Sequence, residues 1–188
     1  VYPELRTRSA EAVSALDLPG IAIGGVSVGE PTAAMREIVA HTVPALPVEK
    51  PRYLMGVGTP EDLLASVAAG IDMFDCVLPS RLGRNGSAYT SRGRINVKNA
   101  RFTESFGPID PDCPEWCCRE HSGAYVRHLY KCDEILAARV LSYHNLAFYA
   151  RLMQGMRDAL DAGRFGAFRT EFLARYRGGE AEEEGPDE

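Results

Sequence analysis

The sequence predicts an α/β fold built from consecutive β-α units. Short apolar runs bounded by glycine or proline lie at residues 20–26, 52–57 and 71–78, and segments with helical spacing of apolar residues separate them. Strands that alternate with helices of this length pair in parallel, and the runs fit a sheet whose outer face is covered. The pattern leaves open whether these units belong to a doubly wound sheet or to a (β/α)8 barrel.

The helical segments have recognisable starts. Residues 4–16 form the first, residues 32–41 the second, and the third opens at Pro60 with Thr59 as its cap. After Pro79 the composition changes. We expect an Arg- and Gly-rich loop at 80–86, short strands at 87–90 and 95–97, a long helical region from about 122 to 160, and a final helix from about 165 to 176.

The formal net charge of -5 comes from the end of the chain. Residues 180–188 carry six acidic side chains and no basic ones, and the remainder holds 20 acidic against 21 basic residues. An acidic terminus of this kind predicts a disordered tail, and the near-neutral remainder neither supports nor excludes a nucleic-acid partner. No apolar run approaches the ~18 residues that span a bilayer. The start at Val1 lacks a Met and a signal sequence, so we interpret it as the interior of a longer polypeptide.

The cysteines indicate a metal site in a reducing compartment. Five is an odd number, and three of the five are clustered within residues 113–118, which argues against a secreted disulfide framework and favours the cytoplasm. Thiolates followed by an imidazole on a helical stretch are typical of a structural zinc site. His121 and His128 are further possible ligands, and buried inert thiols are the competing interpretation. The candidate zinc ligands are two or three of the thiolates of Cys113, Cys117 and Cys118 together with His144.

Asp75 is the strongest candidate for a catalytic residue. It lies in the apolar run 71–78, where burying an unpaired carboxylate is costly, and near the carboxyl end of a parallel strand, where active-site loops converge. It either pairs with Arg81 or Arg84 of the following segment or acts as a base or nucleophile. The two guanidinium groups suit contacts with phosphates and base edges, although a solvated surface loop has the same composition.

Taken in order along the chain, these segments resemble the bacterial tRNA-guanine transglycosylases. Residues 70–86 and 94–102 look like signature segments of that family, and 24–30, 53–58 and 144–149 also match, so the resemblance covers nearly the whole chain apart from the tail. The family folds as a (β/α)8 TIM barrel with an inserted zinc-binding subdomain. The resemblance implies that residues 1–79 are the last three β/α units, 80–144 an RNA-contacting loop and the zinc subdomain, 145–178 C-terminal helices, and 179–188 a disordered acidic tail.

The resemblance also implies an activity. These pentosyltransferases replace guanine at the wobble position of tRNAs with a GUN anticodon by a 7-deazaguanine, which in bacteria is 7-aminomethyl-7-deazaguanine, the queuosine precursor. Asp75 matches the nucleophile that forms the covalent ribose intermediate. The residues that match base contacts are Gly25, Val26, Ser27 and Met55. Those that match RNA contacts are Gly56, Val57, Gly58, Thr59, Pro60, Glu61, Asp62, Ser80, Arg81, Leu82, Gly83 and Arg84.

Some positions depart from the family pattern. The family zinc set is Cys-x-Cys-x-x-Cys followed by His, and Glu115 occupies the middle Cys position here, so we favour Cys117 over Glu115 as the fourth ligand. Ser27 replaces the Ala usual in bacterial members, whereas Val28 is bacterial-like, which favours the aminomethyl base over queuine.

The resemblance also limits what this chain supplies by itself. The family's general acid/base Asp, its base-recognising Asp and its base-recognising Gln lie upstream of the segment that matches Val1. A homodimer follows by resemblance, since Tyr125 and His128 match dimer-contact positions. The alternative function is a non-catalytic RNA-binding or scaffolding subunit of a transglycosylase heterodimer; retention of Asp75, Arg81 and Arg84 argues against it.

Overall fold

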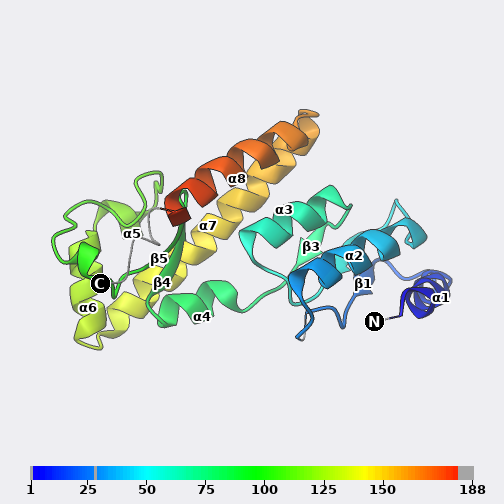
Figure 1. Cartoon of the computed structure of the whole chain (residues 1–188), viewed down its shortest axis with the longest axis horizontal. Coiled ribbons are helices and arrows are strands. Elements are labelled where there is room, and N and C mark those ends of the chain that lie inside the picture. The colour runs from blue at the N-terminus through cyan, green and yellow to red at the C-terminus, as the bar shows by residue number, and fades with distance from the viewer. Residues whose placement is uncertain (1, 28, 182–188) are drawn as a thin grey trace. The chain divides into compact units, whose positions relative to one another are not determined.

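The computed structural model describes residues 2–27 and 29–181, which form parts of two compact units, Val1–Val77 and Leu78–Glu188. Figure 1 shows the order of their elements. The first unit contains α1 (Pro3–Ser14), β1 (Ile21–Ile23), α2 (Thr32–Thr42), the short 3-10 helix η1 (Val43–Ala45), β2 (Arg52–Leu54), α3 (Pro60–Ala68) and β3 (Met73–Phe74).

The three strands of the first unit form a parallel sheet in the order β1-β2-β3, so the predicted α/β class and parallel pairing are confirmed. The strands are shorter than the apolar runs that predicted them. The first ends before Gly25, whose positive φ of 64° turns the chain. The third ends at Phe74, and the apolar residues that follow lead into the next helix.

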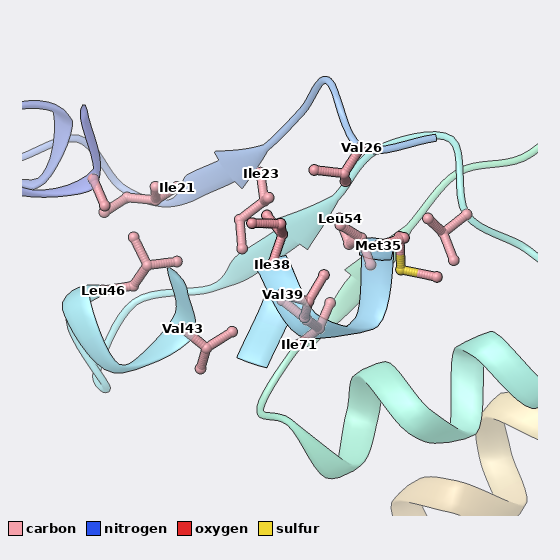
Figure 2. Packing of buried hydrophobic residues seen from close by; sticks show 12 residues of the cluster. Ile21, Ile23, Val26, Met35, Ile38, Val39, Val43, Leu46, Leu54 and Ile71 are labelled. Carbon is pink, nitrogen blue, oxygen red and sulfur yellow. The ribbon is translucent and has the colours of Figure 1, made fainter. Parts of the chain in front are cut away.

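One face of this sheet carries the core of the first unit. Side chains from β1 and β2 pack against α2 on that face (Figure 2), and the buried residues of this contact include Ile21, Ile23, Leu54, Met35, Ile38 and Val39. On the other face, Ala22, Tyr53 and Met73 lie side by side in the register of the three strands. Ala22 and Met73 are exposed and Tyr53 is half-buried. Within this unit the sheet is therefore covered on one face and open on the other.

The start of α3 follows the predicted capping pattern. The Thr59 hydroxyl accepts a hydrogen bond from the Asp62 amide at 3.2 Å, which satisfies one of the backbone donors at the helix start. The Thr59 hydroxyl also donates to the Asp62 carboxylate at 2.7 Å. The side chain of Asp62 further accepts from the Arg36 guanidinium at 2.7 and 2.9 Å, which ties α3 to α2.

The second unit combines a β-hairpin with helices. Its elements are α4 (Leu78–Arg84), β4 (Ser87–Thr90), β5 (Gly93–Asn96), the 3-10 helix η2 (Ala100–Phe102), α5 (Trp116–Arg119), α6 (Gly123–Lys131), α7 (Ile135–Asp161) and α8 (Phe165–Ala181). The strands β4 and β5 pair antiparallel. The long helical region predicted from 122 to 160 is broken between α6 and α7, where Asp133 has a positive φ of 55°.

The prediction of an Arg- and Gly-rich loop at 80–86 is wrong for most of that segment, because α4 extends through Arg84. Gly83 lies against α7, and a Cβ there would come within 2.6 Å of the Ser142 backbone nitrogen. This glycine therefore permits close helix packing. Gly86, with φ of 83°, makes the turn into β4.

Two expected boundaries fall differently in the structure. The boundary expected after residue 144 lies inside α7, and α8 continues to Ala181, so residues 179–181 of the expected tail are helical. The rest of that tail, residues 182–188, lies outside the described residues. None of the helices in the described part of the chain has both the length and the apolarity needed to cross a membrane.

Candidate functional site

Asp75 lies at the carboxyl edge of the parallel sheet, directly after β3. The expectation that it is buried inside an apolar strand is wrong: β3 ends one residue earlier, and the Asp75 side chain is exposed. Because the carboxylate is exposed, it does not carry the desolvation cost of a buried charge, on which the sequence argument for Asp75 partly rested. Its position next to the loops that follow β1 and β2 makes it accessible to a ligand.

Two donors from the β2 segment hold the Asp75 carboxylate. The Tyr53 hydroxyl donates to Oδ1 at 2.6 Å, and the Gly56 amide donates to the same oxygen at 2.9 Å. The Tyr53 hydrogen bond, followed by the Gly56 amide, lowers the pKa of Asp75. The same hydrogen bond raises the pKa of Tyr53, so its hydroxyl stays protonated as a donor. Two donors of its own unit therefore hold Asp75 ionised and oriented.

The Gly56 peptide links the three strand ends. Its N–H group donates to Asp75, and its carbonyl accepts from the Ser27 hydroxyl at 2.9 Å. Gly56 has a positive φ of 74°, which an L side chain rarely adopts. One glycine therefore connects the loop after β1 with the residue after β3.

The predicted base-contacting residues lie around this edge. Met55 is 45% exposed, and its sulfur lies 3.4 Å from where a Cβ on Gly24 would stand. Gly25 and Ser27 are exposed, whereas the Val26 side chain is 1% exposed and packs in the core, which leaves only its backbone for a ligand. Val28 lies outside the described residues.

Sequence reasoning missed two residues at this edge. Tyr53 stands two positions before Met55 in the run 52–57 that was predicted as a strand, and alternation along a strand was the signal that could have identified it. Arg6 of α1 donates to the carbonyls of Gly24 at 2.7 Å and Gly25 at 2.9 Å, which fixes the turn after β1. No local sequence pattern indicates these two hydrogen bonds, because Gly24 and Gly25 are 18 and 19 residues from Arg6 along the chain.

The predicted RNA-contacting residues have unequal exposure. Arg81 and Arg84 are exposed and lie three residues apart on α4, so both project from one side of that helix. Ser80 and Leu82 are half-buried, and Gly83 is buried. In the loop after β2 and the first turn of α3, Gly56 is exposed and Thr59 and Glu61 are half-buried, while the buried members are Val57, Gly58, Pro60 and Asp62.

The second unit brings four potential metal ligands together. Cys113, Cys117, Cys118 and His144 are buried, and their ligand atoms all lie within 4.8 Å of one another. The Cys118 sulfur lies 3.4 Å from Nδ1 of His144. The short helix α5 carries two of the thiols and α7 carries the imidazole, so a bound metal would join these two elements.

The orientation of His144 suits metal ligation. Its Nε2 lies 2.8 Å from the carbonyl oxygen of Tyr89 in β4. A carbonyl only accepts, so Nε2 carries the hydrogen and Nδ1 directs its lone pair at the thiols. The neighbouring Asn145 accepts from the Tyr89 amide at 2.9 Å, and the pair therefore fixes β4 against α7.

The other metal ligands considered from the sequence lie outside this group of four residues. The Glu115 carboxylate accepts from the Tyr143 hydroxyl at 2.9 Å, while the Cys117 sulfur joins the cluster. The ring of His121 stacks edge-on against Trp116, with centroids 5.5 Å apart. His128 lies 3.9 Å from the sulfur of Cys132.

The chemistry of the donor set fits a thiolate-binding metal ion. Hydrogen bonds from Cys117 and Cys118 lower the pKa of Cys113, and donation to that sulfur raises the pKa of Cys117 to about 12. The pKa of Cys118 is raised for the same reason. Three adjacent buried thiols thus cannot all ionise without a cation among them, and a Cys3His set is a common zinc environment.

Comparison with known proteins places the chain in a family. The profile of a family described as queuine tRNA-ribosyltransferase matches residues 1–178. Curated relatives named queuine tRNA-ribosyltransferase include one from Dehalococcoides mccartyi, which is 52% identical over 175 residues, covering 93% of this chain and 45% of the relative. One from Bacillus cereus is also 52% identical, over 93% of this chain and 46% of the relative. One from Lysinibacillus sphaericus is 51% identical with the same coverage.

The match to these relatives lies in their C-terminal part, and the chain spans less than half of their length. The resemblance that the motifs indicated is therefore confirmed over almost the whole chain. The chain belongs to the queuine tRNA-ribosyltransferase family.

Proposed function

We propose that the full-length protein containing this chain exchanges guanine at the tRNA wobble position for 7-aminomethyl-7-deazaguanine, with Asp75 as the nucleophile. The observation that carries the proposal is the Asp75 carboxylate at the sheet edge, held by Tyr53 and Gly56 in a chain of this family. Its lowered pKa keeps the carboxylate ionised, as a nucleophile requires.

The proposed reaction resembles retaining glycosyl transfer. An oxygen of Asp75 attacks the anomeric carbon of the ribose, the bond from that carbon to guanine breaks, and guanine leaves with a proton. The incoming 7-deazaguanine then attacks the same carbon and loses its proton, and Asp75 departs as a free carboxylate. By family resemblance, the acid/base group that moves these protons belongs to the segment upstream of the one this chain matches.

Each of the two units carries exposed groups that are suited to a flat base or to an RNA backbone. Met55 offers an apolar surface for one face of the base, and the backbone at Gly25, Val26 and Ser27 offers polar contacts at its edge. The target base must leave the anticodon stack to reach such a pocket. Arg81 and Arg84 are exposed guanidinium groups that suit phosphate contacts.

We infer that the parallel sheet is the last part of a (β/α)8 barrel. Family membership supports this inference, as do the helix-covered face and the open face formed by Ala22, Tyr53 and Met73. In a closed barrel, such an open face packs against side chains of the other strands. The inserted zinc-binding subdomain corresponds in this proposal to residues 80–144.

The metal in this proposal is one structural zinc ion per chain. Cys113, Cys117, Cys118 and His144 would hold it, and zinc would contribute folding free energy by joining α5 to α7. Metal analysis of freshly purified protein is expected to find about one zinc per chain; its absence would contradict this part of the proposal.

The proposed partners are tRNAs with a GUN anticodon and a second copy of the protein, in the cytoplasm. The homodimer rests on family resemblance at Tyr125 and His128, of which Tyr125 is 44% exposed. The preference for the aminomethyl base over queuine rests on Val28 matching bacterial members.

A base-exchange assay tests the proposed activity. Full-length protein is incubated with tRNA that carries radiolabelled guanine at the wobble position, and then with 7-aminomethyl-7-deazaguanine or queuine. The label is expected to be released with the aminomethyl base and much less with queuine. A protein that binds this tRNA yet releases no label would instead be a non-catalytic RNA-binding subunit.

A further inference from the structure

Arg151 of α7 lies between the metal-ligand cluster and two carboxylates. Its Nη1 donates to the sulfur of Cys113 at 3.5 Å and lies 4.0 Å from Oε1 of Glu115. Its Nη2 lies 4.0 Å from Oδ2 of Asp110. Arg151 follows His144 by seven residues, which is two helical turns, so both side chains project from the same side of α7.

The charge of the cluster calls for a nearby cation. Three thiolates around one zinc ion leave a net charge of -1, and all three cysteines are buried. Asp110, which is 1% exposed, adds a further negative charge close by. Uncompensated buried charge is costly, and a guanidinium group in contact with a thiolate ligand offsets it.

The surroundings of Arg151 are fixed by other contacts. The Asp110 carboxylate accepts from the Ser91 amide at 3.2 Å and the Ser91 hydroxyl at 2.8 Å, and its backbone carbonyl accepts from the Cys113 amide at 3.1 Å. The carboxylate that faces Arg151 is therefore attached to the same turn as the ligand. The planar fork of an arginine suits several partners at once, unlike the point charge of a lysine.

Glu115 is the carboxylate that stands where the family pattern has a cysteine. Arg151 faces its Oε1 and the Tyr143 hydroxyl donates to its Oε2 at 2.9 Å. These contacts give each oxygen of the Glu115 carboxylate a protein partner in place of a metal ion. They leave the fourth ligand position to Cys117, which is fully buried in the cluster.

We propose that Arg151 is a positioning residue of the metal site: it donates to the Cys113 thiolate, offsets the charge of the three thiolates, and retains Glu115 outside the coordination shell. This inference rests on the proposed zinc site. The Arg151 side chain is 33% exposed, so solvent screens part of its charge. Outer-shell partners typically change metal affinity about 10- to 100-fold, and screening places the expected effect nearer to 10-fold.

The test compares zinc affinity among variants of the full chain. Arg151→Met removes the charge and keeps an unbranched stem, Arg151→Lys keeps a charge without the fork, and Arg139→Met is a control at an exposed arginine of the same helix. Chelator competition is expected to show zinc bound about 10-fold more weakly by Arg151→Met. Arg151→Lys should fall between that variant and the wild type, and Arg139→Met should match the wild type.

Cobalt substitution supplies a second readout. In Arg151→Met the thiolate-to-cobalt absorbance should decrease as Glu115 competes for the metal, and adding Glu115→Gln should restore it. Wild-type zinc affinity in Arg151→Met, or equal losses in the Met and Lys variants, would overturn the inference. A wild-type protein that binds no zinc would instead overturn the metal proposal itself. Circular dichroism checks folding, and Arg151→Gln replaces the Met variant if that protein does not fold.

Discussion

Replacing Gly83 with alanine is expected to destabilise the second unit. The added Cβ would lie 2.6 Å from the backbone nitrogen and 2.7 Å from the Cα of Ser142 in α7. These are backbone atoms, so a side-chain rotation cannot relieve the contact, and α4 or α7 must shift. Overpacking of this kind costs typically about 1–3 kcal/mol, and the better helix propensity of alanine returns at most about 1 kcal/mol. With the clash at the upper end of that range, the net loss is about 2 kcal/mol.

Urea unfolding followed by tryptophan fluorescence measures this loss directly. Trp116 is the one tryptophan of the chain and lies in α5, so its signal reports on the second unit. Gly166→Ala is the matched control: Gly166 is an exposed helical glycine of α8 with nothing within 4 Å of an added Cβ. It should stabilise the same unit by at most about 1 kcal/mol. If both substitutions stabilise the unit, the close approach of α4 to α7 is refuted.

Three further predictions address the two sites and the α3 cap. Tyr53→Phe removes the main cause of the lowered pKa of Asp75, so the pKa of Asp75 should rise. The acidic limb of the pH-rate profile for base exchange should then move to higher pH, and an unmoved limb would contradict this prediction. Cys118→Ala and His144→Ala should each lose zinc and unfold residues 113–144, measured by metal analysis and amide hydrogen exchange, and retention of one zinc by either would count against the ligand set. Thr59→Ala should cost about 1 kcal/mol in urea unfolding because the α3 cap is lost, whereas Thr59→Ser should stay within a few tenths of wild type.

Local pattern predicted most of the secondary structure. Helical spacing and capping residues located α1, α2 and α3, and apolar runs located the three parallel strands. The same runs misled where apolar residues serve a different purpose. Residues 76–78 continue the apolar character of β3 but lead into α4, so Asp75 stands at the end of the strand and is exposed.

The incorrect prediction of a loop at 80–86 arose because glycine has two different structural roles. Gly83 was interpreted as a loop residue, but its role depends on the distance between α4 and α7, which no local pattern encodes. Gly86, three residues later, does have the positive φ expected of a turn glycine. From the sequence alone the two glycines are indistinguishable.

The candidate metal site was also predictable only in part from the sequence. Cysteine spacing, the following His144 and the family zinc pattern together were sufficient to propose four ligands that the structure brings together. Their outer partners were not predictable: the Tyr89 carbonyl is 55 residues from His144, and Arg151 is 38 residues from Cys113. Such contacts depend on how distant segments pack, so they emerge only from the three-dimensional structure.

Trapping the covalent intermediate tests the central proposal most directly. Full-length wild-type protein, Asp75→Asn and a matched Asp72→Asn control are incubated with tRNA and separated on denaturing gels. Asp72 is an exposed neighbouring carboxylate that accepts from the Arg52 amide at 2.8 Å and lies just before β3. A protein-tRNA adduct is expected for the wild type and for Asp72→Asn, and none for Asp75→Asn. An adduct that persists in Asp75→Asn would contradict the assignment of Asp75 as the nucleophile.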